Sequence, residues 1–130
     1  MPGERNLEKI LASLDPLLQP GEYVFCSVVD PLQIDVSKCV ATFREHEGFS
    51  VVMARDDADD AKLEYQQTFS WIALSVHSSL EAVGLTAAFS TALSQAGISC
   101  NVVAAFYHDH IFVPVPDAQR AVDILKGLSD

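Results

Sequence analysis

The sequence predicts an α+β fold in which antiparallel sheets carry helices packed on one face. Three observations support this class. Strand-like runs are rich in aromatic and β-branched residues, helical stretches place apolar residues on one stripe, and Pro or Gly marks many of the boundaries. The 130 residues, 49% of them hydrophobic, suffice for one compact domain or two very small ones.

The first half is expected to begin with a helix, because Leu7, Ile10, Leu11, Leu14 and Leu18 share one face at helical spacing. Glycine at a tight turn favours a hairpin turn near Glu47-Gly48. In chain order the first half should form a helix, a strand, a loop, a hairpin and the start of an acidic helix, at residues 4–18, 21–29, 30–38, 38–54 and 56–63.

The second half carries clearer signals. Gly97 is a suitable C-cap for the preceding helix, and Pro116 suits the first turn of the last one. In chain order this half should form a strand, a loop, a helix, two strands and a helix, at residues 69–77, 78–84, 85–97, 98–107, 111–115 and 116–128.

The two halves resemble each other at an offset of 60 positions, which brings Asp57-Ala58 onto Asp117-Ala118. We therefore interpret the chain as a degenerate tandem, with an N-terminal half at residues 1–66 and a C-terminal half at residues 67–130. The second half lacks the last strand of a ferredoxin-like βαββαβ unit. A strand from the first half, for instance residues 22–29, is expected to supply it, so that the halves share strands.

The stretch VHSSLEAVGLTAAFSTALSQAGISCNVVAA resembles the opening of an ACT domain: a strand, a loop ending in Gly-Leu, a helix closed by Ala-Gly-Ile, and a strand containing Asn. With YHDHIFVP and an earlier Glu-Gly hairpin turn, the chain resembles the small tandem ACT-like proteins of bacteria. The resemblance is strong over residues 70–128 and weaker over residues 6–66. It implies an ACT-like ferredoxin fold and a regulatory role, because ACT domains bind amino acids or similar effectors, usually between paired domains.

The resemblance places the effector pocket at the loop over residues 78–86 and at the strand over residues 101–103. A helix N-terminus there offers unpaired N–H groups to a carboxylate, and Gly84 permits close approach to the backbone. Hydroxyl groups, the Glu81 carboxylate and the Asn101 amide add polar contacts. The predicted ligand-binding residues are Ser78, Ser79, Leu80, Glu81, Val83, Gly84, Leu85, Thr86, Asn101, Val102 and Val103.

The predicted pocket has alternative interpretations. Ser and Thr at a helix entry are common caps, Gly84 can simply serve a turn, and Asn101 can satisfy backbone groups at a strand edge. Ala82-Val83 stand where many effector-binding ACT domains have an acidic residue and a proline. A ligand-free interaction or dimerisation module of the same fold therefore remains the second hypothesis.

His108-Asp109-His110 raises the possibility of a metal-dependent enzyme, the third hypothesis. A structural zinc site needs four ligands and a catalytic one usually three, and only two His and one Asp are adjacent here. We therefore expect this tripeptide to form the turn of a hairpin, with no metal or other cofactor bound. Ser78 beside His77 lacks a GxSxG setting, so we expect no catalytic residues and no enzyme.

The net charge of −10 argues against nucleic acid and against anionic membrane surfaces, because both attract Lys and Arg. The odd number of cysteines (Cys26, Cys39 and Cys100) fits no zinc motif and favours free thiols in a reducing cytoplasm. The expected partners are thus a small-molecule effector, further copies of the chain in a homo-oligomer, and possible protein partners.

Overall fold

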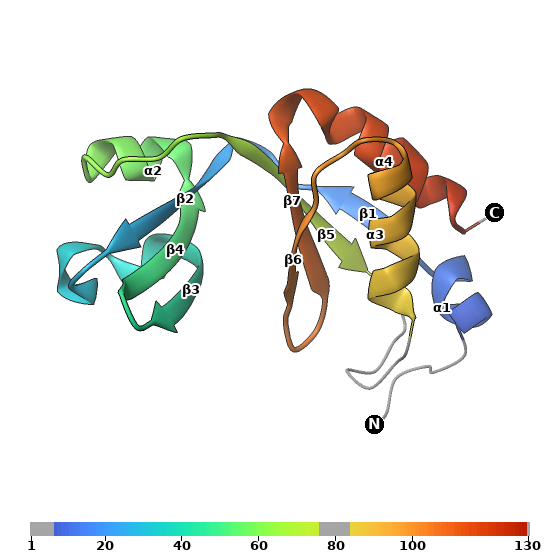
Figure 1. Ribbon diagram of the computed structural model, residues 1–130, viewed down its shortest axis with the longest axis horizontal. Coiled ribbons are helices and arrows are strands. Elements are labelled where there is room, and N and C mark those ends of the chain that lie inside the picture. Colours follow the sequence, from blue (N-terminus) through green and yellow to red (C-terminus); the bar gives the residue numbers. More distant parts are fainter. Residues whose placement is uncertain (1–6, 76–83, 130) are drawn as a thin grey trace. The chain divides into compact units, whose positions relative to one another are not determined.

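The computed structural model describes residues 7–75 and 84–129, and the chain divides into two compact units. Unit 1 comprises the residues up to Gln19 together with those from Ser70 onward. Unit 2 comprises Pro20–Phe69. Figure 1 labels the elements, and its colours show that unit 1 is built from both ends of the sequence.

Unit 1 contains four strands in the order β1-β5-β7-β6. From β5 onward it runs strand, helix, strand, strand, helix, as expected for a ferredoxin-like unit without its last strand. Its elements are α1 (Leu7–Ala12), β1 (Asp15–Leu18), β5 (Phe69–Ser75), α3 (Leu85–Gln95), β6 (Asn101–Ala104), β7 (Asp109–Pro114), a 3₁₀ turn η3 (Val115–Asp117) and α4 (Ala118–Gly127).

The missing strand is β1, which pairs antiparallel with β5 so that Asp15 lies opposite Ser75. A strand of the first half thus completes the unit as expected, but it lies at residues 15–18 and not at the suggested residues 22–29. The prediction of a helix over residues 4–18 was wrong beyond Ala12. Proline disfavours helical geometry in the residue before it and clashes with a preceding turn, so Pro16 ends the helix and favours extended backbone. The apolar residues that follow Pro16 belong to a strand, although their spacing also fits a helix.

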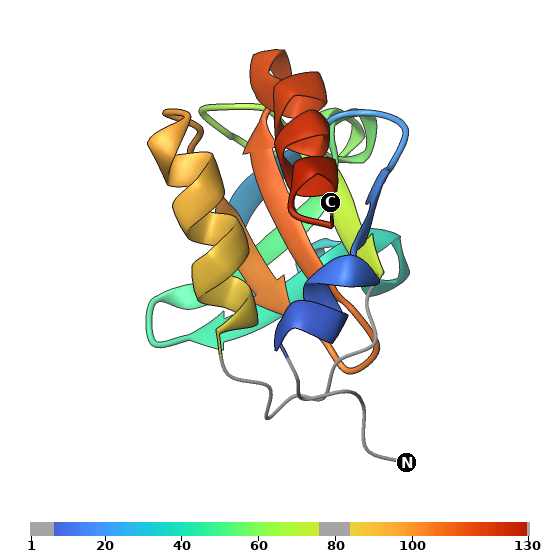
Figure 2. The ribbon, with the colours of Figure 1, turned by 90° about the vertical axis from the view of Figure 1, so that its right-hand side faces the viewer.

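The core of unit 1 lies between its sheet and its helices. Figure 2 shows α1, α3 and α4 in front of the strands of this unit. Phe89 of α3, Ile72 of β5 and Leu125 of α4 are completely buried together in this core. The helices of this unit thus cover one face of its sheet, as predicted. Gly97, just past α3, has the positive φ of 75° that a helix C-cap requires.

Unit 2 is a smaller antiparallel sheet in the order β3-β4-β2, and Phe69 pairs with Tyr23 of β2. A single helix, α2, packs over this sheet, and Ala58 is buried against Val24 and Met53. The elements are β2 (Tyr23–Val28), two 3₁₀ turns η1 (Pro31–Gln33) and η2 (Val36–Lys38), β3 (Cys39–Glu45), β4 (Gly48–Ala54) and α2 (Arg55–Asp60).

One of the two hairpin turns lies where the sequence predicts it, and the other does not. The β3–β4 turn precedes Gly48 as expected, and Gly48 has a φ of 151°. The β6–β7 turn instead spans residues 105–108, closed by a 3.0 Å bond from the Ala105 N–H to the His108 carbonyl. The prediction that His108-Asp109-His110 forms the turn was therefore wrong, because Asp109 and His110 are already paired in β7.

None of the helices in residues 7–75 and 84–129 is long and apolar enough to cross a membrane.

Candidate functional site

The predicted pocket begins at Gly84, the residue before α3. Gly84 has a left-handed φ of 95°, which favours glycine, and its carbonyl accepts the first helical bond from the Ala88 N–H at 2.8 Å. Leu85 turns into the core, whereas Thr86 is exposed. Gly84, the N-cap residue, has no side chain with which to cap α3, and no described side chain caps its first turn.

Helix α1 covers Gly84 from one side. A methyl group added to Gly84 would stand 3.3 Å from Leu7 Cδ2, so the Leu7 side chain occupies the space next to this glycine. A ligand that approached the Gly84 backbone would meet Leu7 or displace it. The remaining predicted loop residues, Ser78, Ser79, Leu80, Glu81 and Val83, lie outside the described residues.

The predicted strand residues lie on β6. Asn101 is exposed, and its Nδ2 donates a long hydrogen bond of 3.4 Å to the Phe112 carbonyl. Val102 packs partly against the core, and Val103 lies opposite His110 in β7. The bond to Phe112 explains Asn101 as a residue that satisfies a backbone carbonyl at the edge of the sheet. Ligand binding by Asn101 stays a prediction.

The structure separates Gly84 from Asn101. The 11 residues of α3 lie between them, and a helix of that length is roughly 16 Å long. Figure 1 shows that β6 begins near the C-terminal end of α3, whereas Gly84 precedes its N-terminal end. The start of α3 and the start of β6 thus lie near opposite ends of α3, and a pocket that includes both Gly84 and Asn101 stays a prediction.

A pocket in unit 1 lies at the C-terminal end of α3. Its volume is about 480 Å³, and it is lined by Ser90, Thr91, Ser94, Gln95, Ile98, Ser99 and Cys100. Burial raises the pKa of the Cys100 thiol to about 11, so the thiol stays protonated at neutral pH. All three cysteines are free, and Cys100 behaves as a small apolar residue, as the sequence indicated.

The histidines form a small aromatic and polar cluster. The Trp71 Nε1–H donates to His110 Nδ1 at 2.9 Å, and the His108 and His110 rings lie 6.3 Å apart. Burial, followed by the neighbouring His108, lowers the pKa of His110, whereas burial raises the pKa of the Asp109 carboxyl. No three His, Cys, Asp or Glu side chains within residues 7–75 and 84–129 are placed to hold a metal ion.

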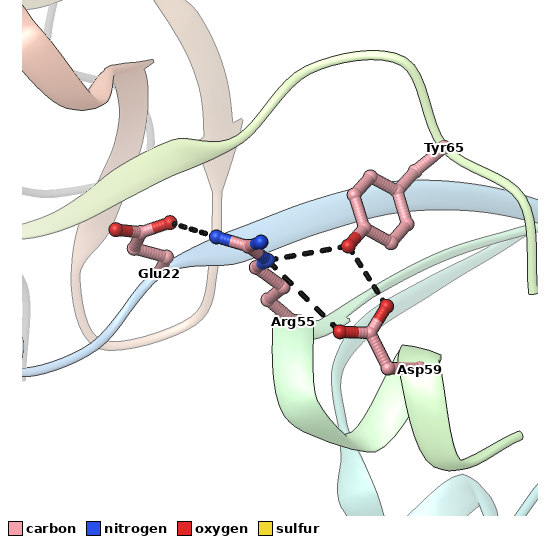
Figure 3. A network of polar contacts seen from close by, with 4 residues as sticks. All are labelled: Glu22, Arg55, Asp59 and Tyr65. Atoms are coloured by element: carbon pink, nitrogen blue, oxygen red, sulfur yellow. Dashed lines mark hydrogen bonds and ion pairs between the residues drawn. The ribbon is translucent and has the colours of Figure 1, made fainter.

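A polar network in unit 2 was missed by the sequence analysis (Figure 3). Arg55 Nη1 lies 3.0 Å from Glu22 Oε1, Arg55 Nε donates to the Tyr65 hydroxyl at 3.2 Å, and that hydroxyl donates to Asp59 at 2.8 Å. The Tyr65 hydrogen bond and then Glu22 raise the pKa of the guanidinium. The signal in the sequence was a single Arg at the head of the acidic run RDDADD, which we had interpreted only as a helix start.

Comparison with known families gives two adjacent matches. Two family models, each described as an ACT domain, match residues 2–70 and residues 68–127. No match was found among the curated proteins.

Solved structures give close and distant likenesses. A Vibrio cholerae protein of unknown function, described as a possible transport protein, is 49% identical over 95% of this chain and 96% of its own, with a TM-score of 0.86. An Agrobacterium tumefaciens protein is 20% identical over 90% of each chain, with a TM-score of 0.65. The ligand-free regulatory subunit of aspartate kinase from Thermus thermophilus is 9% identical over 92% of this chain and 99% of its own, with a TM-score of 0.64, which shows a shared fold.

Proposed function

The chain belongs to the ACT domain family, and we propose that it is a regulatory protein that binds a small effector, an amino acid, without catalysing a reaction. The two ACT matches together span nearly the whole chain, and ACT domains commonly bind small effectors and assemble in pairs. The regulatory subunit of aspartate kinase, which shares the fold, supports a regulatory rather than a catalytic role.

The start of α3 is the observation that carries this proposal. Left-handed Gly84 leads into an 11-residue helix whose first turn has no described side-chain cap. Such a turn presents N–H groups and a partial positive charge, which favour the carboxylate of an amino acid. Thr86 is exposed beside it and adds a hydroxyl donor and acceptor.

The contact between Leu7 and Gly84 supports a second candidate, a ligand-free interaction module of the same fold. Leu7 Cδ2 would lie 3.3 Å from a β-carbon at Gly84, so an apolar side chain already occupies the space beside the glycine. In the first candidate, an effector displaces Leu7. In the second, Leu7 is the lasting occupant and the protein acts only through its partners.

A homo-oligomer is part of the proposal. Strand β6 lies at the edge of unit 1, in the order β1-β5-β7-β6, and its Asn101 and Ala104 are exposed. An edge strand has unpaired N–H and C=O groups that a second copy can pair with. Because Gly84 and Asn101 lie apart within one chain, an effector that contacts both would lie between copies.

The free cysteines also favour the cytoplasm as the site of action.

A thermal-shift panel of the untagged protein against the twenty amino acids, repeated by calorimetry, tests the proposal. A ligand that binds only the folded state raises the melting temperature with concentration. We expect at least one amino acid to do so, and Gly84→Ala to abolish the shift.

Gly97→Ala is the matched control, because Gly97 also has a positive φ, of 75°, and has no atom within 4 Å of an added methyl group. It should lower stability in the same way as Gly84→Ala but keep the ligand response. A panel that is flat for the wild type and remains flat for Leu7→Ala would contradict the sensing role and favour the interaction module.

A further inference from the structure

Unit 2 contains a pocket of its own, next to the network of Figure 3. Its volume is about 340 Å³, a size suited to a small metabolite, and it lies where β2 begins and β4 passes into α2. The lining residues are Pro20, Gly21, Glu22, Tyr23, Ala54, Arg55 and Asp56.

The lining combines both signs of charge within a small space. Arg55 pairs with Glu22 through Nη1 and bonds to Tyr65 through Nε, and no described residue accepts a hydrogen bond from Nη2. The Asp56 carboxylate has no described hydrogen-bond or ion-pair partner. The Arg55 guanidinium can therefore donate to an anion through Nη2, and the Glu22 and Asp56 carboxylates can accept from a cation.

The fold does not require these charges. At the offset of 60 positions, the β7–η3 junction of unit 1 corresponds to the β4–α2 junction of unit 2. Ala54 has φ −58° and ψ 139°, and Pro114 has φ −55° and ψ 139°, so the backbone takes the same path at both junctions. Unit 1 makes that turn with Val115-Pro116, where unit 2 has Arg55-Asp56. The charged lining is thus an addition to a turn that apolar residues also form.

We propose that this pocket binds a small zwitterion, whose carboxylate contacts the Arg55 guanidinium and whose ammonium contacts Glu22 and Asp56. A charge-assisted bond to a guanidinium is among the stronger polar contacts in proteins. A molecule with both charges can contact Arg55 and the carboxylates at once, whereas an ion with one charge can contact only one of the two kinds of group. This site goes beyond the proposed function, because it lies in unit 2 and uses none of the residues around Gly84.

The test is a two-dimensional amide NMR titration of the full chain with glycine, β-alanine and L-ornithine at millimolar concentrations. Acetate and methylammonium are the probes with one charge. We expect at least one zwitterion to shift the amides of Gly21, Tyr23, Arg55 and Asp56 in a saturable way. The single ions should cause weaker shifts at the same amides, or none.

Two matched pairs of variants test the assigned charges. Arg55→Gln should weaken binding by roughly tenfold or more, the size expected for one charge-assisted bond, whereas Arg44→Gln, an exposed arginine outside the pocket, should not. Asp56→Asn should weaken binding by roughly threefold, whereas Asp60→Asn removes the same charge elsewhere on α2 and should leave it unchanged.

Three results would overturn the site: no saturable shift with any zwitterion, shifts of equal size with acetate, or unchanged binding in both Arg55→Gln and Asp56→Asn. If Arg55→Gln disturbs the fold, as its spectrum would show, Asp56→Asn with Glu22→Gln decides the question. Gly84→Ala separates this proposal from the effector site, because zwitterion binding at Arg55 should survive that change. Loss of the Arg55 shifts in Gly84→Ala would place the binding elsewhere.

Discussion

The two units differ most in one connecting segment, which joins β5 to β6 in unit 1 and β2 to β3 in unit 2. In unit 1 this segment includes the 11-residue helix α3, which buries Leu85, Phe89 and Leu93 in the core. In unit 2 it contains only the two 3₁₀ turns η1 and η2, neither of which buries a residue completely. A β-sheet of the same general plan thus persists without the helix whose N-terminus would hold an ACT-type effector.

The sequence explains why unit 2 forms turns instead of a helix. Asp30 accepts a hydrogen bond from the Leu32 N–H at 2.9 Å, and Asp35 accepts one from the Ser37 N–H at 3.0 Å. Aspartate side chains compete in this way with helical bonding, and each cap starts a new short turn. Leu32 is 90% exposed, so the segment contributes little to its core. Only unit 1 therefore has, between these strands, the helix start at which we propose that the effector binds.

The largest loss of stability is expected when a core side chain of α3 is shortened. Phe89 is completely buried, and Phe89→Ala should lower the free energy of unfolding by about 3–5 kcal/mol through lost burial and a cavity. The equivalent segment of unit 2 gives the control: Val36, on η2, is 54% exposed, and Val36→Ala should change stability by less than about 0.5 kcal/mol. Urea unfolding measures both, and similar losses would contradict the difference between the segments.

A smaller effect is expected at the β3–β4 turn of unit 2. A methyl group at Gly48 would stand 2.8 Å from the Val28 carbonyl oxygen, and the residue has a φ of 151°. Gly48→Ala should therefore cost about 1–3 kcal/mol. Gly127→Ala, in helix α4 with no atom within 4 Å of the added methyl group, should be neutral or stabilising. Melting temperatures from circular dichroism separate the two, and an unchanged value for Gly48→Ala would refute the expected clash.

The Trp71–His110 bond predicts a pH dependence confined to unit 1. His110 accepts through Nδ1, so protonation there removes the acceptor, and its pKa is lowered below 6.5 mainly by burial. A lowered folded-state pKa gives stability that is present above pH 6.5 and lost as the pH falls through the folded value. Asp109 acts in the opposite sense, because its raised pKa stabilises the fold below pH 3.8 and that contribution is lost as the pH rises.

Trp71 fluorescence and urea unfolding between neutral and mildly acidic pH measure this effect. The wild type should lose stability as His110 gains a proton, whereas His110→Gln retains an acceptor and should flatten the profile. His46→Gln removes an exposed imidazole in unit 2 and should leave the wild-type profile intact. Identical profiles for the wild type and His110→Gln would show that another group titrates.

The smallest effect is expected for the network at α2. The Tyr65 hydroxyl bridges Arg55 and Asp59, and Tyr65→Phe removes both bonds while retaining the ring that packs on the core of unit 2. These groups are largely exposed, so the loss should be at most about 1 kcal/mol. Urea unfolding at low and high salt measures it, and a loss as large as that of Phe89→Ala would show that the network holds unit 2 together.

Local chemistry explains how far the sequence predicted the fold. Glycine at positions 48 and 97 marked a turn and a helix end correctly, because positive φ is a backbone property that glycine reveals directly. Leu14 and Leu18 misled the analysis, because an apolar spacing that fits a helix also fits a strand, and Pro16 was the better signal. The pairing of β1 with β5 is a contact between distant segments, which no local pattern encodes.

The candidate sites were hard to predict for the same reason, because they depend on contacts between segments that are distant in the sequence. Gly84 and Asn101 were chosen as neighbours from a family pattern, but the length of α3 sets them apart within one chain. Arg55 and Glu22 are 33 positions apart in sequence, so their pairing became visible only once β2 and the start of α2 were placed. A single Arg preceding four acidic residues was nevertheless a signal that the sequence contained.

Hydrogen exchange of the full chain, measured by mass spectrometry with pools of the twenty amino acids, tests whether the start of α3 is an effector site. We predict that one pool slows exchange in the peptides at the start of α3, over residues 84–89, because a bound carboxylate would occupy their N–H groups. In unit 2, η1 and η2 should show no such protection. Exchange at the start of α3 that is unchanged by every pool would contradict the claim that this helix start is an effector site.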